Sequence, residues 1–152
     1  IGLYYAQPLT EKNVKVKLSD VSVKDWKTVG MPAEAANAID GDPQTVWTAK
    51  ALTPLVVDMG KASEVIGFSY APAQKEDLTG TIYKYNFYVS IDGKNWTKCD
   101  AGGEFSNIMH NPVPYFVRFG KKYPARYFKL EPVAEINNKP ATTVGEVGIL
   151  LK

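Results

Sequence analysis

Three oxygen-bearing side chains within six positions form the part of this sequence best suited to bind a metal ion. Asp40, Asp42 and Thr45 surround Gly41, and a glycine allows the chain to turn sharply. Carboxylate, hydroxyl and carbonyl oxygens are the ligands of hard cations, and the loop offers no nitrogen or sulfur ligand. The pattern therefore predicts a structural cation site. A simpler interpretation stays open, in which the two aspartates only form turns of the Asx type.

The other reactive side chains favour binding over catalysis. His110 is the only histidine and Cys99 the only cysteine, so we expect neither a zinc site nor an intrachain disulfide. No Gly-x-Ser-x-Gly element accompanies them. A glycosidase needs two carboxyl groups, one with its pKa raised by apolar surroundings. Two pairs of carboxylates lack such surroundings, so no hydrolytic site is predicted: Glu76–Asp77 and Asp40–Asp42.

Short alternating segments that end at Gly, Pro, Asn or Asp must position these loops. They predict an all-β antiparallel sandwich. In one of them Tyr85, Phe87 and Val89 share a face, and Asp92-Gly93 follows as a hairpin turn. Helical pattern is limited to a single turn at 32–37, with Pro32 first. The strands are expected at 14–18, 54–60, 65–70, 84–91, 115–119, 126–130 and 146–151.

Length and charge set the class of protein. The chain has 152 residues, enough for one domain and one core. Its net charge of +2 gives no electrostatic reason to expect nucleic acid or an anionic membrane as a partner. No run approaches the roughly 20 apolar residues of a membrane span. The chain begins at Ile1 rather than methionine, which suggests a processed product or a piece of a longer protein.

Five motifs in a fixed order give the chain a family resemblance. The motifs are Ala38 to Asp42 with Thr45 and Trp47, Val57 to Gly60, Tyr85 to Trp96, Ala125 to Leu130, and Gly145 to Val147. They resemble the coagulation factor 5/8 type C (discoidin) domain, whose bacterial branch is the family 32 carbohydrate-binding modules. The resemblance implies an eight-stranded antiparallel jelly roll. It also implies a single domain over residues 1–152, excised from a larger glycoside hydrolase that is periplasmic, secreted or on the bacterial cell surface.

A further segment narrows the resemblance. Gly103 to Ile108, followed by Asn111-Pro112, is similar to the modules appended to bacterial α-L-fucosidases and β-hexosaminidases.

The resemblance implies a Ca²⁺ site, with Na⁺ as an alternative ion. Its ligands would be the side chains of Asp40, Thr45 and Glu146, with the carbonyl oxygens of Asn37, Asp42, Thr45 and Gly145. Such an ion would tie the C-terminal strand to the early loop and so restrict the unfolded chain.

The resemblance also places a sugar site on loops at one end of the sandwich. Galactose-binding members carry a His after the loop Trp and an Arg after a Pro, but here Thr48 follows Trp47 and Ala73 follows Pro72. Polar residues that could replace them are Thr48, Lys50, Gln74, Lys75 and Glu76.

A sugar also needs an aromatic face on which its C–H bonds can stack. We expect Trp26 to be exposed and to serve as that face. The equal alternative is that Trp26 is an edge residue that covers the sandwich. Trp47 and Trp96 are assigned to the core. Tyr70 and Tyr115 are expected to be structural, with a place in the lining of the site as the alternative. The polar loop at 136–141 is expected at the ligand end.

These features predict a non-catalytic carbohydrate-binding module. It would hold a terminal fucose, N-acetylglucosamine or galactose and keep the parent catalytic domain near its glycan. Two other functions stay open. One is a scaffold module that packs on its parent enzyme with no sugar site, because the His and Arg are missing. The other is a protein-binding or membrane-binding discoidin domain, which the sequence supports only through Trp26 and its lysine neighbours.

Overall fold

The computed structural model describes residues 17–42, 44–74, 77–106, 108–109 and 113–151. Its strands form an antiparallel β-sandwich, which confirms the predicted fold class. The expected first strand at 14–18 lies largely outside the described residues. No helix in the described ranges is long and apolar enough to cross a membrane. The strands are β1 (Lys27–Thr28), β2 (Trp47–Ala49), β3 (Leu55–Ala71), β4 (Ile82–Ser90), β5 (Thr97–Glu104), β6 (Tyr115–Glu135), β7 (Thr142–Val144) and β8 (Glu146–Leu150).

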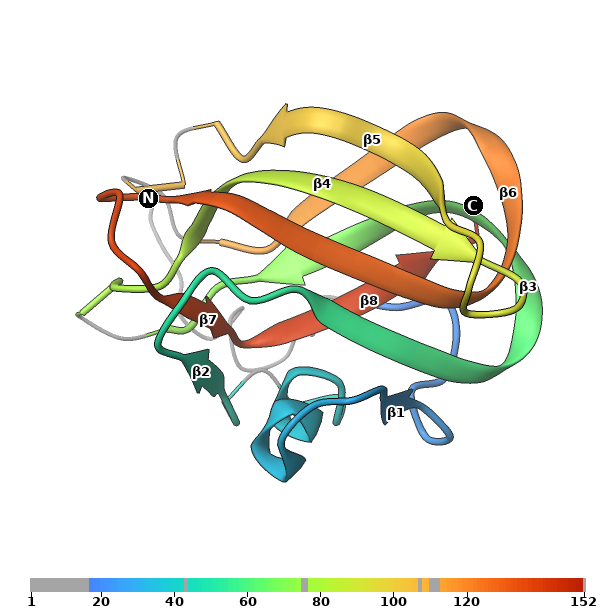
Figure 1. Cartoon of the computed structure of the whole chain (residues 1–152), viewed down its shortest axis with the longest axis horizontal. Coiled ribbons are helices and arrows are strands. Elements are labelled where there is room, and N and C mark those ends of the chain that lie inside the picture. Colours follow the sequence, from blue (N-terminus) through green and yellow to red (C-terminus); the bar gives the residue numbers. More distant parts are fainter. Residues whose placement is uncertain (1–16, 43, 75–76, 107, 110–112, 152) are drawn as a thin grey trace, which may run out of the picture.

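Two long strands, β3 and β6, each contribute to both layers of the sandwich. The start of β3 pairs with β1 and with the end of β6, which continues the layer to β4 and β5. The end of β3 pairs with β8 and with the start of β6. Figure 1 shows both strands bending around the same end of the molecule, at the right of the view. Four of the strands expected from the sequence are therefore parts of only two strands, β3 and β6.

Glycines permit these bends without ending the strands. Gly60 has φ +86° and Gly120 has φ +85°, a region that residues with a Cβ rarely adopt. The register between β3 and β6 shifts between Asp58 and Ser63 and again after Val65, and pairing then resumes. A bulge of this kind turns the strand direction and increases its twist, so one strand can serve two layers.

Aromatic side chains fill the space between the layers. Phe68 of β3 stacks on Phe87 of β4 at 4.1 Å between ring centroids, and Tyr70 stacks on Phe105 at 4.9 Å. Tyr85, Phe87 and Val89 are buried, as their alternation predicts. Each such side chain contributes about 1.5–3 kcal/mol by leaving water. This core fixes the ends of the strands and hence the loops that could bind a ligand.

The expected helical turn is a 3₁₀ helix, η2 (Ala33–Ala38), with Pro32 as its N-cap. Ala35 and Ala38 are the buried residues of this helix, and Ile39 closes it by donating its backbone N–H to the carbonyl of Ala36. The helix thereby anchors the start of the loop that carries Asp40. Two short strands, β2 and β7, pair with each other beyond this loop, as Figure 1 shows.

Candidate functional site

Four oxygen atoms converge in the loop after η2. The hydroxyl of Thr45 lies 2.8 Å from the carbonyl oxygen of Asp42, 3.4 Å from that of Asn37, and within hydrogen-bonding distance of Asp40 Oδ2. A hydroxyl has one proton, so it can satisfy only one of these three acceptors at a time. The loop therefore presents more lone pairs than donors, which is the property of a cation site.

Glu146 brings a buried carboxylate to the same loop from the start of β8. Its side chain is 1% exposed, and Oε2 accepts the backbone N–H of Gly41 at 2.8 Å. The other oxygen, Oε1, is buried with no hydrogen-bond partner among the described residues. Burial, together with the negative charges of Asp40 and Asp42, raises the pKa of Glu146 to about 8. A buried acid with one oxygen unpartnered, beside other carboxylates, fits a bound cation.

The two aspartates also form Asx turns, as the simpler interpretation expected. Asp40 Oδ1 accepts the backbone N–H of Asp42, and Asp42 Oδ1 accepts that of Gln44, both at 2.9 Å. The side chain of Asp42 is thus used within the loop, whereas Asp40 keeps Oδ2 on the side of Thr45. Among the described residues, no three His, Cys, Asp or Glu side chains gather as metal ligands. A cation would therefore depend on hydroxyl and carbonyl oxygens as well as carboxylates.

The structure separates the residues predicted for the sugar site. Thr48 is exposed on β2 opposite Thr143, and Lys50 is exposed just after that strand. Gln74 is exposed beyond β3 and donates to the carbonyl of Pro72 at 3.1 Å. None of the three lines the groove beside the loop at 136–141 that is described below. Lys75, Glu76 and His110 lie outside the described residues.

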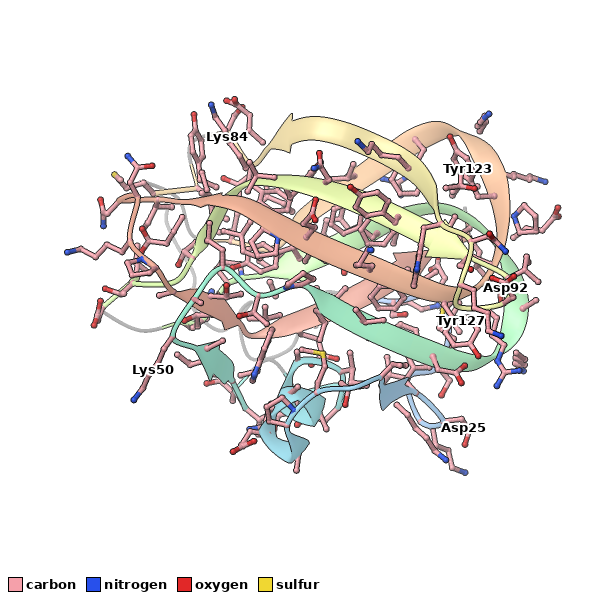
Figure 2. The ribbon with its side chains drawn as sticks, viewed as in Figure 1. Asp25, Lys50, Lys84, Asp92, Tyr123 and Tyr127 are labelled. Atoms are coloured by element: carbon pink, nitrogen blue, oxygen red, sulfur yellow. The ribbon has the colours of Figure 1, made fainter. Side chains whose placement is uncertain are left out.

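The prediction that Trp26 is exposed is wrong. Its side chain is only 7% exposed, and its ring packs edge-on against Phe128 at 5.3 Å between centroids. The neighbouring Lys24 and Asp25, which lie in a turn before β1, and Lys27 do reach solvent. A ring buried in this way offers no face to a sugar. Figure 2 places its neighbour Asp25 well away from the end that carries Lys50.

Trp96 was predicted to be a core residue but is less buried than that, whereas Trp47 is buried as expected. Trp96 is half-buried on the outer face of the sheet, where the ammonium of Lys129 lies 4.7 Å from its ring centroid. The same ammonium lies 4.6 Å from the ring of Tyr88. The ammonium of Lys129 thus makes a cation–π contact with both rings.

Tyr70 and Tyr115 are structural, as expected. The buried hydroxyl of Tyr70 donates to the carbonyl of Thr143 at 2.7 Å and accepts the backbone N–H of Ile82. Burial raises the pKa of Tyr70 well above its usual range. The hydroxyl of Tyr115 donates to the carbonyl of Ser106 at 3.0 Å.

A groove of about 410 Å³ lies beside the loop at 136–141, the loop expected at the ligand end. Figure 1 shows this connection between β6 and β7 at the left end of the sandwich. Two of the lining side chains, Leu52 and Val133, are exposed hydrophobics at 40% and 47%. The full lining is Leu52, Val133, Ala134, Glu135, Asn138, Lys139 and Pro140.

Buried polar groups hold both walls of this groove. Glu135 is 2% exposed; its Oε1 accepts the backbone N–H groups of Asn137 and Lys139 at 2.6 and 2.9 Å, and its Oε2 accepts that of Gly80 at 2.8 Å. On the facing wall, Thr142 accepts the N–H of Thr53 and donates to the carbonyl of Ala51. The groove is therefore preformed. Glu135 is not among the site residues predicted from the sequence, because a strand pattern does not show that an acid is buried.

Comparison with known proteins adds three findings. A family model described as the F5/8 type C domain matches residues 17–147. Among curated proteins, the galactose oxidase of Gibberella zeae is 29% identical over 143 residues, which cover 86% of this chain and 20% of that protein. The chain thus spans about a fifth of the length of such a relative.

Two solved structures show the same fold. A family 32 carbohydrate-binding module of Clostridium perfringens, solved with GalNAc-β-1,3-galactose, has a TM-score of 0.73 and 22% identity, covering 86% of this chain and 99% of that one. A Bacteroides ovatus protein assigned as an α-L-fucosidase has a TM-score of 0.68 and 34% identity, covering 98% of this chain and 22% of that protein.

Proposed function

Because this chain belongs to the F5/8 type C domain family, we propose that it is a carbohydrate-binding module that keeps a parent glycoside hydrolase at its glycan. The family's modules are non-catalytic, and so is this domain. The sugar would be a terminal fucose, N-acetylglucosamine or galactose. The α-L-fucosidase and galactose oxidase relatives, and the solved module with its galactose-containing disaccharide, support a ligand of this class.

The preformed groove at 136–141 is the observation that carries the proposal. Leu52 and Val133 offer apolar surface to the C–H bonds of a pyranose, while Asn138 and Lys139 offer hydrogen-bond donors to its hydroxyls. Because Glu135 already fixes the loop, a ligand would lose little affinity to loop ordering. No aromatic residue lines the groove. We therefore expect weak binding, with a Kd of about 1 mM, which corresponds to a binding free energy of roughly −4 kcal/mol.

Weak binding suits a module that is tethered to an enzyme. A second binding event within one molecule takes place at high effective concentration, so a surface with many copies of the sugar retains the protein. The parent enzyme would then act repeatedly on neighbouring glycans.

A structural Ca²⁺ ion would complete this module. Asp40, Thr45 and Glu146 would supply side-chain oxygens, and Asn37, Asp42, Thr45 and Gly145 carbonyl oxygens. The ion would supply the positive charge that the loop and the unpartnered oxygen of Glu146 lack, and would tie β8 to the loop after η2. Na⁺ is the alternative occupant.

A glycan array, followed by calorimetry with two lysine variants, tests the sugar site. Hits that share one terminal sugar are expected in the presence of calcium. Lys139→Ala should weaken binding of that sugar several-fold, whereas Lys50→Ala, an exposed lysine outside the groove, should not. A larger loss of affinity in Lys50→Ala than in Lys139→Ala would indicate that the sugar site lies at the end of β2. A blank array with a folded protein would contradict the binding function.

A scaffold role is the second candidate, and one segment favours it. Three exposed large hydrophobic side chains come from a single stretch: Met109 at 40%, Val113 at 41% and Phe116 at 39%. Exposed apolar side chains that gather in one patch mark surfaces that another domain covers, so these three are the candidates for such a surface. Hydrogen exchange on the full-length protein and on the isolated domain would distinguish the two functions. Protection around Phe116 only in the full-length protein would favour the scaffold.

A further inference from the structure

We propose that the domain has a second carbohydrate site, a pocket for one neutral sugar ring at the end of the sandwich opposite the groove. The pocket has a volume of about 250 Å³ and lies between the β4–β5 turn and the bend of β6. Figure 2 shows Asp92 and Tyr123 at this end and Lys50 at the other. The volume of this pocket is below the roughly 300–1,000 Å³ of pockets for drug-sized ligands, so the pocket suits a single sugar ring.

An aromatic residue forms the apolar wall that a pyranose requires. The half-buried ring of Tyr123 is held edge-on against Phe119 at 5.8 Å, and the exposed Lys121 places its ammonium 5.0 Å from the centroid of the same ring. Pro124 continues the wall. Ile91 lies across the pocket and is 53% exposed, the highest fraction among the exposed large hydrophobic side chains of the described residues. Apolar C–H bonds of a sugar could contact these three side chains.

The opposite wall is polar and already ordered. Asp92 Oδ1 accepts the backbone N–H groups of Lys94 and Asn95 at 2.8 Å, and Oδ2 accepts the side-chain amide of Asn95 at 2.8 Å. Ser90 accepts the backbone N–H of Gly93 at 2.9 Å. These bonds fix the turn, and they hold the pKa of Asp92 far below its usual range. The aspartate is thus fully used by the turn.

Three hydrogen-bonding groups remain available around the pocket. Asn95 uses its amide nitrogen on Asp92, so its side-chain oxygen keeps its acceptor capacity. The hydroxyl groups of Thr97 and Tyr123 form no hydrogen bond with another side chain or backbone group of the described residues. The set contains one amide oxygen and two hydroxyls. Neutral donors and acceptors beside an apolar wall match the hydroxyls and C–H bonds of an uncharged sugar better than a phosphate or carboxylate.

Two sites at opposite ends would let one domain bridge two sugar residues. The glycan at the second end would be a separate chain or branch, because the sandwich separates the two sites. Bridging would raise retention on a dense glycan surface beyond what one weak site provides. The pocket does not depend on the groove for any of its residues, so either site can exist without the other.

Amide NMR titration of the isotope-labelled domain tests the proposal directly. The probes are methyl β-galactoside, methyl β-N-acetylglucosaminide and methyl α-L-fucoside, each added to millimolar excess. Saturable shifts of the Asn95 and Thr97 amides with at least one probe are expected. Thr97→Val and Tyr123→Phe should each weaken that binding several-fold, because each removes a hydroxyl and keeps the shape of the side chain.

Tyr83→Phe is the matched control. It removes a hydroxyl that binds the exposed Glu104 and does not line the pocket, so the shifts at Asn95 should stay as they are in the unchanged domain. Shifts confined to Asn138 and Lys139 would support the groove and overturn the second site. Shifts confined to Asn95 and Thr97 would support the second site and contradict the groove. Shifts at Asn95 that persist unchanged in both pocket variants would also overturn the proposal.

Discussion

Gly41 donates its backbone N–H to Glu146 Oε2 at 2.8 Å, a hydrogen bond that joins residues 105 positions apart. It connects the loop after η2 to the first residue of β8. The second oxygen of the same carboxylate is buried without a partner among the described residues, so the connection is only half satisfied by the protein. A cation at Asp40 and Thr45 would satisfy the other half.

Glu146→Gln should abolish stabilisation by calcium. The amide oxygen can still accept the Gly41 N–H, but the charge is gone. At a calcium concentration 100 times its Kd, the unchanged domain should gain about 2.7 kcal/mol. Melting curves with calcium and with a chelator measure this gain. We expect the variant to melt at one temperature in both.

Asp42→Asn provides the control for that experiment. Its side chain serves the N–H of Gln44, and only its backbone carbonyl lies near Thr45, so calcium should still stabilise this variant. Asp40→Ala should behave like Glu146→Gln. If the melting temperature of the unchanged domain were the same with calcium and with a chelator, that result would contradict the ion site.

Glu135→Gln should loosen the loop at 136–141 and weaken sugar binding at the groove. The carboxylate accepts three backbone N–H groups, and a glutamine would present its NH₂ to at least one of them. We expect a loss of about 1–3 kcal/mol in the free energy of unfolding. Urea denaturation measures it. Glu131→Gln is the matched control on the same strand, because Glu131 is half-buried and, within the described part of the chain, accepts its hydrogen bonds from the side chains of Asn86 and Tyr88. An equal loss in the control would show that Glu135 has no special role.

The ion pair between Asp58 and Arg126 should make stability depend on acid. Arg126 binds both carboxylate oxygens, at 2.9 and 3.0 Å, and this lowers the pKa of Asp58. A lowered pKa means that the folded state holds the proton less tightly than the unfolded state. The contribution is therefore present above the ordinary value of 3.8 and is lost as the pH falls below it.

Solvent screening reduces the contribution of this ion pair to stability, because the side chains of Asp58 and Arg126 are 22% and 43% exposed. We expect about 0.5 kcal/mol at neutral pH. Urea denaturation of the unchanged domain and of Asp58→Asn should give this difference at neutral pH and almost none at about pH 3. A difference that grows in acid would contradict the sign.

The sequence predicts the architecture well where a pattern has one physical cause. The period-two burial of Tyr85, Phe87 and Val89 follows from strand geometry alone. The lengths of β3 and β6 could not be predicted in this way. Gly60 and Gly120 resemble turn ends, and only the pairing of distant strands shows that the ladder resumes beyond them.

The sequence predicts the groove only through its loop. A polar, turn-rich stretch at 136–141 indicates a loop but does not show which distant residues face it. Leu52 reaches the groove because Thr53 is tied to Thr142 across 89 positions. Burial of an acid such as Glu135 depends on three backbone donors that the fold brings together, and no local pattern contains them.

Trp26→Ala should destabilise the domain much more than Trp96→Ala. Trp26 is 7% exposed and packs on Phe128, so its loss should leave a core cavity and cost about 3–5 kcal/mol. Trp96 is half-buried and contacts the ammonium of Lys129, so its loss should cost roughly 1 kcal/mol. Urea denaturation followed by circular dichroism measures both values without depending on tryptophan fluorescence. Equal costs would show that Trp96 is a core residue after all, as its sequence motif had predicted. Unchanged sugar affinity in folded Trp26→Ala at low temperature would further separate this ring from binding, because a buried side chain supports the fold and not the ligand.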